Sequence, residues 1–318
     1  MEDIASLYPL RSTRPQNLEP ISFKSGDTAI IVEAISEPSF TEVTLIHDTE
    51  SELFSMPISH NYLLKMRPGQ KFRHTLQNGM TKYFNIFLLN SNLWRYTLDL
   101  RTQILYTPDI AQIISCLELA AGDRVVEAGT GSGCLSHALC EVLGEKGHLF
   151  TYEYNENRYN CASEEFKRHN LNVTITHRDV QKNGFLLEDQ DISNSIDGLF
   201  LDVPEPWNCV EHIVKVLRPG AIFVNFSPCV EQVQKVIEAL SATGDFSDFK
   251  TFECYYREFN YLKKGVQNPD ILAGRPREST EKVVLPLVKP CSYVFEHQEI
   301  FRSHTGYLSV FRYAPFNE

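Results

Sequence analysis

The chain has 318 residues and a formal net charge of −11, from 30 basic and 41 acidic side chains. That length allows one large or two ordinary domains, and the acidic balance argues against nucleic-acid binding by this chain unaided. No apolar stretch approaches the roughly 18 residues that span a bilayer, so we expect no membrane segment. The acidic N-terminus, with Glu2 and Asp3, predicts no secretory signal. The cysteines lack the spacing of a zinc site, so we expect no metal.

Residues 1–17 are interpreted as an N-terminal tail, and residues 18–100 have the pattern of a small all-β domain. Two β-branched runs of strand length, at 27–35 and 41–49, flank a turn around Pro38. Asn78-Gly79 between two further runs indicates a hairpin of the two-residue turn type. Short strands with frequent turns predict a compact barrel.

Residues 101–318 have a different pattern, in which strands alternate with helices. Thr107-Pro108 predicts a helix start with the threonine as its cap. Strands are expected at 123–128, 148–153, 172–179, 196–203 and 221–227, with helices between them, a helix at 230–240, and late strands at 249–256 and 306–313. This alternation predicts an α/β fold with a mostly parallel sheet covered by helices on both faces. Residues 263–300 have little periodicity and are interpreted as a long loop or insertion.

A glycine-rich turn follows the first of these strands. Gly129, Gly131 and Gly133 come after Glu127 and before a helix expected to begin near Ser132. Glycines let a ligand approach the backbone amides, and the free N–H groups of the helix face the same space. The dinucleotide fingerprint places its third glycine one residue later, so a dehydrogenase is disfavoured.

Acids follow the next two strands as well. Glu153 ends the second strand, where a carboxylate can accept both hydroxyls of a ribose, and Asp179 ends the third, where it can reach an adenine amine. Together these residues predict an adenosine group laid across three strands. The alternative is that the glycines only form a turn and both acids are solvated.

The string VVEAGTGSGCLS resembles the first motif of the Rossmann-like S-adenosylmethionine-dependent methyltransferases. In that family an acid after the second strand holds the ribose, which Glu153 matches, and an Asp after the third faces the adenine, which Asp179 matches. Five segments resemble more narrowly the catalytic subunit of the eukaryotic tRNA (adenine-58-N1)-methyltransferases: RTQILYTPDIA, GTGSGCLSHA, FLDVPEPW, FSPCVEQVQ and HTGYLSVF.

The resemblance implies a cofactor site and a catalytic acid. It assigns S-adenosylmethionine contacts to Gln103, Glu127, Gly129, Thr130, Gly131, Ser132, Gly133, Leu135, Ser136, Glu153, Arg158, Asp179, Val180 and Asp202. Asp202 is implied to be the catalytic carboxylate, and a cap of the following helix is the alternative. Trp207 fits a pocket wall and a core position equally. Glu205 departs from the family, which usually carries a small residue there.

The resemblance also implies the substrate and partners. The expected reaction is methyl transfer to nitrogen 1 of adenine-58 of tRNA, with a homologous non-catalytic subunit, two such pairs forming a heterotetramer, and a nuclear location. Much of the RNA surface would then come from the partner, which accounts for the acidic balance. Local basic candidates, each of which also fits a solvated charge, are Arg11, Arg14, Arg73, Lys263, Lys264, Arg275 and Arg277.

Two other classes of function stay open from the sequence. A methyltransferase acting on protein or a small molecule would share the glycine loop but would not need the N-terminal barrel or the RTQILY segment. A non-catalytic RNA-binding subunit of the same fold could lose the glycines and the acid at 202, and this chain keeps both. Transfer of a labelled methyl group to tRNA, to protein or to nothing separates these classes.

Overall fold

A computed structural model describes residues 21–35, 38–76, 78–255, 259–263, 293–297 and 305–316. The expected tail at 1–17 and most of the expected insertion at 263–300 lie outside these residues. At the flanks of that insertion, β13 (Phe259–Lys263) and β14 (Tyr293–His297) pair as antiparallel strands. The segment interpreted as a long loop or insertion at 263–300 therefore contains a strand at 293–297.

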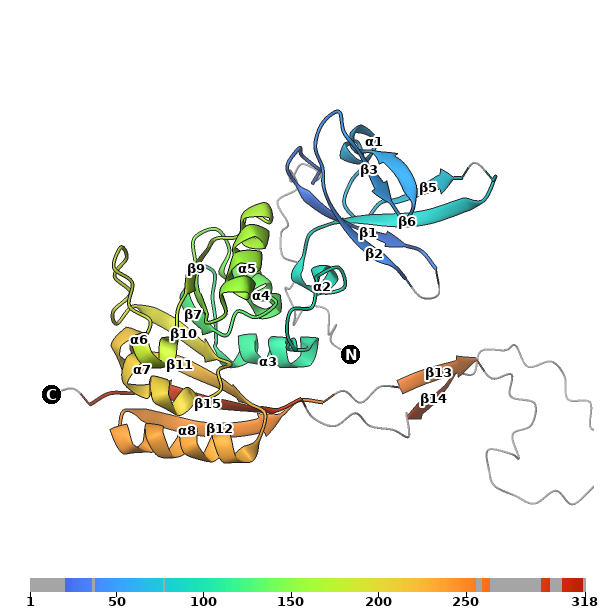
Figure 1. Cartoon of the computed structure of the whole chain (residues 1–318). Coiled ribbons are helices and arrows are strands. Elements are labelled where there is room, and N and C mark those ends of the chain that lie inside the picture. Colours follow the sequence, from blue (N-terminus) through green and yellow to red (C-terminus); the bar gives the residue numbers. More distant parts are fainter. Residues whose placement is uncertain are drawn as a thin grey trace, which may run out of the picture.

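The N-terminal strands form two antiparallel sheets around their own apolar core (Figure 1). Their elements are β1 (Thr28–Glu33), β2 (Phe40–Thr44), β3 (Glu50–Leu53), β4 (Met56–Ser59), α1 (His60–Leu64), β5 (Lys71–Thr75) and β6 (Thr81–Leu88). The larger sheet has the order β2-β1-β6-β5, and β3 pairs with β4. β2 and β5 are thus the edges of an open sheet, and closure into a barrel stays a prediction.

The Asn78-Gly79 hairpin exists, but its loop is longer than expected. The Leu76 amide donates to the Met80 carbonyl oxygen at 2.8 Å, so the loop closes between Leu76 and Met80. Gly79 has φ +83°, a left-handed conformation typical of the last residue of such a loop. The two-residue turn type is therefore wrong, because the glycine closes the loop.

The second unit is built on a seven-stranded sheet of order β12-β15-β11-β10-β7-β8-β9. Its strands are β7 (Arg124–Ala128), β8 (His148–Glu153), β9 (Val173–His177), β10 (Ile196–Leu201), β11 (Leu217–Ser227), β12 (Phe246–Glu253) and β15 (Tyr307–Tyr313). β11, β10, β7, β8 and β9 run parallel, whereas β15 is antiparallel to both β11 and β12. The predicted mostly parallel sheet is confirmed.

Helices cover both faces of this sheet because successive side chains of each strand point to opposite faces. On β7, Val125 belongs to a cluster with α3 (Thr107–Cys116) and α4 (Cys134–Leu143), and Val126 to a cluster with α7 (Val210–Val216) and α8 (Val230–Thr243). The remaining helices are α2 (Ser91–Trp94), α5 (Glu156–Arg168), α6 (Val180–Asn183) and the 3₁₀ helix η2 (Pro206–Cys209). None of the helices in the described residues is long and apolar enough to cross a membrane.

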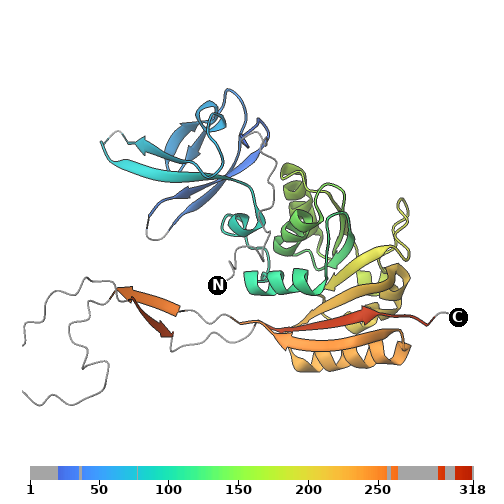
Figure 2. The same cartoon turned by 180° about the vertical axis from the view of Figure 1, so that it is seen from behind.

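Two views show α2 and its flanking segment connecting the two units (Figures 1 and 2). α2 contacts α4, and its Trp94 is buried. Ser91 donates two hydrogen bonds to Glu141 on α4, from its amide at 2.6 Å and its hydroxyl at 2.8 Å. Trp94 and these bonds fix the N-terminal unit beside the helix that follows the glycine turn.

Candidate active site

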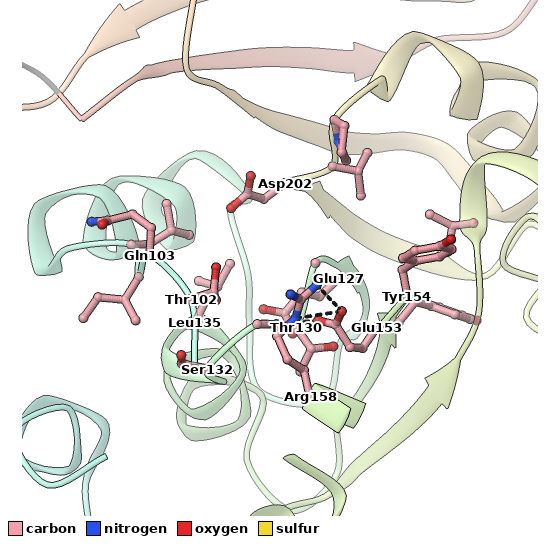
Figure 3. Close-up of a pocket in the computed structure, with 18 of the residues that line it drawn as sticks. Thr102, Gln103, Glu127, Thr130, Ser132, Leu135, Glu153, Tyr154, Arg158 and Asp202 are labelled. Carbon is pink, nitrogen blue, oxygen red and sulfur yellow. Dashed lines mark hydrogen bonds and ion pairs between the residues drawn. The ribbon is translucent and has the colours of Figure 1, made fainter. Parts of the chain in front are cut away.

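A cavity of about 460 Å³ opens where β7, β8 and β10 end (Figure 3). This is the edge of an open α/β sheet at which ligands ordinarily bind. Residues from the glycine turn, the ends of the strands, the 102–105 segment and the starts of α6 and α8 line it. The predicted site residues among them are Gln103, Glu127, Gly129, Thr130, Gly131, Ser132, Leu135, Glu153, Arg158, Asp179, Val180 and Asp202.

Two glycines shape the cavity because no Cβ fits at their positions. Gly129 has φ +97°, and a Cβ there would lie 2.3 Å from the carbonyl oxygen of Asp202. A Cβ on Gly131 (φ +56°) would lie 2.9 Å from the Thr102 methyl group. The glycines therefore allow the turn to pack against the end of β10 and against the 102–105 segment at once.

Gly133 and Ser136 do not line the cavity. Gly133 is the left-handed N-cap of α4, and a Cβ there would lie 3.1 Å from the ring of Phe166. Ser136 is fully buried and donates a 2.6 Å hydrogen bond to Glu127. Both residues support the turn from behind. Neither belongs to the residues that line the cavity, and their direct contact with a cofactor stays a prediction.

Glu153 is a buried carboxylate at the end of β8 that holds several donors. Its Oε1 accepts from the Asn155 amide at 2.8 Å and from Nε and Nη2 of Arg158 at 3.1 and 2.7 Å. Its Oε2 accepts from the Gly131 amide at 2.9 Å. Because an ionised oxygen takes about two donors, Oε2 retains capacity for a ligand hydroxyl. Arg158 thus positions Glu153 as well as lining the cavity.

Glu127 lies deeper and is almost completely buried. Ser136 and Thr151 donate to its Oε2 at 2.6 and 2.7 Å, and Thr130 in turn donates to Thr151 at 2.7 Å. Burial raises the pKa of Glu127 to about 7, although the two hydroxyl donors oppose this, and the charges of Asp202 and Glu153 add to it. A cation in the cavity would therefore favour the ionised form of Glu127.

Asp202 follows β10 directly and faces the cavity from the side opposite Glu153 and Arg158 (Figure 3). Its amide donates to the Ala128 carbonyl at 2.9 Å, which fixes its backbone against the glycine turn. Among the described residues its carboxylate has no hydrogen-bond donor, and burial raises its pKa to about 6. The alternative role as a helix cap is not seen, because η2 has no side-chain cap and its N-cap is Glu205.

The segment 101–106 closes one side of the cavity and is fixed at several points. The Arg101 guanidinium makes a bidentate ion pair with Glu165 on α5, at 2.7 and 2.9 Å, and its amide donates to the Ser132 hydroxyl at 3.1 Å. Gln103 lines the cavity and donates to the Tyr106 hydroxyl at 3.2 Å.

The expected threonine cap at the start of α3 is wrong. The Thr107 hydroxyl accepts a hydrogen bond from Arg95 and caps no helix, and the N-cap of α3 is Tyr106.

Asp179 lies two residues beyond β9 and is the N-cap of α6. Its Oδ1 accepts from the Gln181 amide at 3.1 Å, and its Oδ2 pairs with Lys182 at 3.0 Å. Val180 follows as a buried residue in the same wall. Asp179 therefore keeps its predicted place at the cavity, but it reaches that place through a helix cap and not through a strand.

Twelve further residues line the cavity, and of these Cys134 belongs to the glycine-loop segment and Thr102, Ile104 and Leu105 to the RTQILY segment, both of which carry the family resemblance. The twelve are Thr102, Ile104, Leu105, Cys134, Tyr152, Tyr154, Arg178, Gln181, Val203, Pro204, Pro228 and Gln232. Most of them adjoin a predicted residue in the sequence, so proximity to a motif was the available signal.

Trp207 packs against the core, and the Lys235 ammonium lies 4.5 Å from the centroid of its ring. Trp207 does not line the cavity. In the described part of the chain, no cluster of His, Cys, Asp or Glu could hold a metal ion.

Comparison with known proteins decides the family. The model of the tRNA methyltransferase complex GCD14 subunit family matches residues 82–285. This chain belongs to that family. A relative from Dictyostelium discoideum, a tRNA (adenine(58)-N(1))-methyltransferase catalytic subunit, is 37% identical over 80% of this chain and 86% of its own length. The counterparts from Schizosaccharomyces pombe and Kluyveromyces lactis are 37% and 32% identical, and this chain spans only 60% and 63% of their lengths.

Solved structures share the fold of this family member. A SAM-dependent O-methyltransferase from Thermotoga maritima aligns with a TM-score of 0.65 at 24% identity, covering 93% of this chain and 96% of its own. The tRNA (m1A58) methyltransferase TrmI from Aquifex aeolicus aligns with a TM-score of 0.60 at 23% identity, covering 93% of this chain and all of its own. The Rossmann-like methyltransferase fold is therefore confirmed.

Proposed function

We propose that this chain is the catalytic subunit of an enzyme that transfers a methyl group from S-adenosylmethionine to nitrogen 1 of adenine-58 of tRNA. The observation that carries the proposal is the placement of Asp202, an acceptor without a donor among the described residues, beside the glycine turn and across the cavity from Glu153. The names of the family members given above support the substrate.

The cavity suits S-adenosylmethionine in shape and in charge. Glycines at 129 and 131 keep side chains out of the turn, and Glu153 has room at Oε2 for a ribose hydroxyl. Four carboxylates, Glu127, Glu153, Asp179 and Asp202, line it against two guanidinium groups, of which Arg158 is already paired with Glu153. A net negative lining favours a positively charged sulfonium over the neutral thioether that remains after transfer.

The residues of the chain then account for the chemistry. When bound, S-adenosylmethionine supplies a methyl group on a positively charged sulfur. Nitrogen 1 of adenine becomes part of a cationic ring as it gains the methyl group, and the Asp202 carboxylate can accept a hydrogen bond from the exocyclic amine and stabilise that charge. The walls formed by Thr102, Gln103 and the glycine turn fix the geometry of approach, which supplies a further part of the rate.

The substrate must bring one base into a cavity of about 460 Å³. The reacting edge of adenine-58 is covered in folded tRNA, so the nucleotide is extruded into the site. The rest of the RNA lies on outer surfaces, and with a net charge of −11 this chain supplies only part of a phosphate-binding surface. We therefore propose that a homologous non-catalytic subunit pairs with this chain and that two such pairs form a heterotetramer in the nucleus. Within this chain, we propose that residues 18–100 form a barrel-like domain and residues 101–318 the methyltransferase domain.

Methyl transfer from labelled S-adenosylmethionine tests the proposal. Unmodified tRNA is incubated with this chain, with and without its partner subunit, and the digested RNA is assayed for 1-methyladenosine. We expect product when both subunits are present. Label on protein, or on another nucleoside, would overturn the substrate and leave the cofactor site standing. Size-exclusion chromatography with light scattering tests the heterotetramer, and imaging of the tagged protein tests its nuclear location.

A further inference from the structure

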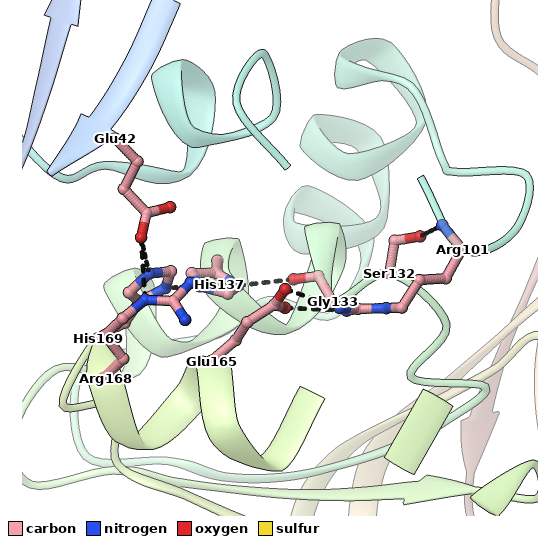
Figure 4. A network of polar contacts seen from close by, with 8 residues as sticks. All are labelled: Glu42, Arg101, Ser132, Gly133, His137, Glu165, Arg168 and His169. Carbon is pink, nitrogen blue, oxygen red and sulfur yellow. Dashed lines mark hydrogen bonds and ion pairs between the residues drawn. The ribbon is translucent and has the colours of Figure 1, made fainter. Parts of the chain in front are cut away.

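A chain of hydrogen bonds joins the N-terminal sheet to the glycine turn (Figure 4). Glu42 on β2 lies 3.0 Å from Nε2 of His169, whose Nδ1 lies 2.8 Å from Nε2 of His137. Nδ1 of His137 lies 2.8 Å from the carbonyl oxygen of Gly133, the last glycine of the turn. Glu42 and His169 are 127 residues apart in sequence, so this contact belongs to the tertiary fold alone.

Both histidines are enclosed by the protein. His137 is 2% and His169 8% exposed, and Trp94 stacks on the His137 ring at 3.7 Å and meets His169 edge-on at 5.7 Å. Burial lowers the pKa of His137 to about 3, so this ring is neutral at physiological pH. His169 is also the C-cap of α5, where the helix carbonyl groups favour a positive charge.

The positions of the protons follow from the acceptors. A carbonyl oxygen only accepts, so Nδ1 of the neutral His137 donates to Gly133 and its Nε2 is a lone pair. The proton between the two rings must then sit on Nδ1 of His169. The other nitrogen of His169 faces Glu42, and a lone pair there would oppose a carboxylate lone pair. The bond to Glu42 thus requires a second proton on His169 or a proton on Glu42.

The surroundings of Glu42 decide between these two arrangements. Burial raises the pKa of this carboxyl, but the hydrogen bond and charge of His169 and the charge of Arg168, whose Nε lies 3.0 Å away, outweigh burial and lower it. Arg168 is a permanent cation and lies within ion-pair distance of Glu42 whatever the state of His169, so Glu42 is a carboxylate and the second proton of this hydrogen-bond chain belongs to His169. Four groups surround the His169 ring: Glu42 from β2, Arg168 from α5, His137 from α4 and Trp94 from α2.

We propose that His169 is a positioning residue that carries a proton on both ring nitrogens and fixes the N-terminal sheet relative to the glycine turn during methyl transfer. This inference rests on the proposed function, because only a substrate much larger than the cavity needs surfaces outside it. RNA held by the N-terminal unit reaches Asp202 in one orientation when the link is intact. Without the link, the contacts of α2 remain to hold the unit but leave its orientation less fixed, and productive docking becomes less frequent.

Steady-state kinetics of the complete complex test the positioning role. In Glu42→Ala, Arg168 and His169 lose their acceptor, and we expect the KM for tRNA to rise about tenfold with the affinity for S-adenosylmethionine within about twofold of wild type. Glu42→Gln should recover most of this loss, because its amide N–H can donate to a neutral His169. Glu33→Ala is the matched control, since it removes an ion pair with Lys82 inside the N-terminal sheet without touching the histidines, and its KM should stay near that of wild type.

Nitrogen NMR of the full chain labelled at histidine tests the protonation independently of the substrate. We expect both ring nitrogens of His169, assigned by its loss in His169→Gln, to carry protons at neutral pH, and one to lose its proton in Glu42→Gln. A singly protonated His169 in the wild type, or an unchanged KM in a folded Glu42→Ala complex, would overturn the inference. Failure of the proposed function is distinct: the wild-type complex itself would make no 1-methyladenosine.

Discussion

The Thr305 hydroxyl lies 3.0 Å from each carboxylate oxygen of Asp109, across 196 residues of sequence. Asp109 is in the first turn of α3, directly after the segment that closes the cavity, and Thr305 precedes β15. The next residue, Gly306, packs so closely that a Cβ would lie 2.5 Å from the Phe226 ring. The segments RTQILYTPD, FSPC and HTGYL therefore meet in space, which gives the last of them a structural role behind the site.

Replacement of Thr305 by valine should lower the free energy of unfolding by about 1–3 kcal/mol, because a buried carboxylate loses its hydroxyl donor. Burial already raises the pKa of Asp109, and the Thr305 bond opposes that rise. The folded form therefore tolerates ionisation of Asp109 less in the variant, and its loss of stability should grow as the pH rises. Thermal unfolding at acidic and alkaline pH measures this, and Thr305→Ser should restore the wild-type stability. Equal losses at both pH values would contradict the account.

Asp202→Asn keeps the shape of the side chain and removes its charge. We expect kcat to fall by about 10²- to 10³-fold, since the developing charge on the adenine ring loses its counter-charge. Binding of S-adenosylmethionine, measured by calorimetry, should change by less than about threefold, because Glu153 and the glycine turn stay in place. Turnover equal to that of wild type would remove Asp202 from the mechanism.

The dependence of kcat/KM on pH should report the ionisation of the Asp202 carboxylate. The pKa of Asp202 in the free enzyme is about 6, and only the ionised form is active in this mechanism. As the pH falls through about 6, kcat/KM should fall, approaching tenfold for each further pH unit. Glu127, with a pKa of about 7, ionises in the same pH range and would add a second inflection to the profile, so the Glu127→Gln variant is measured in parallel. A limb near pH 6 that persists in Asp202→Asn would assign it to another group.

Gly129→Ala should destabilise the fold by about 2–4 kcal/mol and abolish cofactor binding, because its Cβ would lie 2.3 Å from the Asp202 carbonyl oxygen. Gly244→Ala is the control: this glycine also has a positive φ, of +74°, but nothing lies within 4 Å of its added Cβ. It should cost only about 1 kcal/mol. Chemical denaturation compares the two, and similar losses would show that conformation alone, and not the contact with β10, makes Gly129 necessary.

Local sequence patterns were sufficient to predict the parts of the site that lie next to strands. Glu127, Glu153 and Asp202 each end or follow a strand, and parallel strands bring their carboxyl ends to one edge of the sheet. The helix expected between the strands at 148–153 and 172–179 is present as α5, and the strand expected at 306–313 lies within one residue of its observed bounds. The cofactor contacts assigned by resemblance stay predictions, although twelve of the fourteen residues line the cavity.

Contacts across long sequence distances could not be predicted. Nothing in the run from Phe40 to Thr44 indicates that Glu42 faces His169, because strand periodicity gives only the face of the sheet and not the partner. The same limit applies to the hydrogen bond that Ser136 donates inward to Glu127, a contact that motif matching does not predict. A hydroxyl one turn into a helix can point to ligand or to core, and only the packing of α4 on β7 and β8 decides which.

The most direct test is mass spectrometry of tRNA nucleosides after incubation with S-adenosylmethionine and the two-subunit complex, with wild-type and Asp202→Asn chains side by side. We expect 1-methyladenosine with the wild type, none when adenine-58 is replaced by another base, and a loss of at least about 100-fold in rate with Asp202→Asn. Equal rates of 1-methyladenosine formation by the two chains, or methylation that persists without adenine-58, would contradict the account.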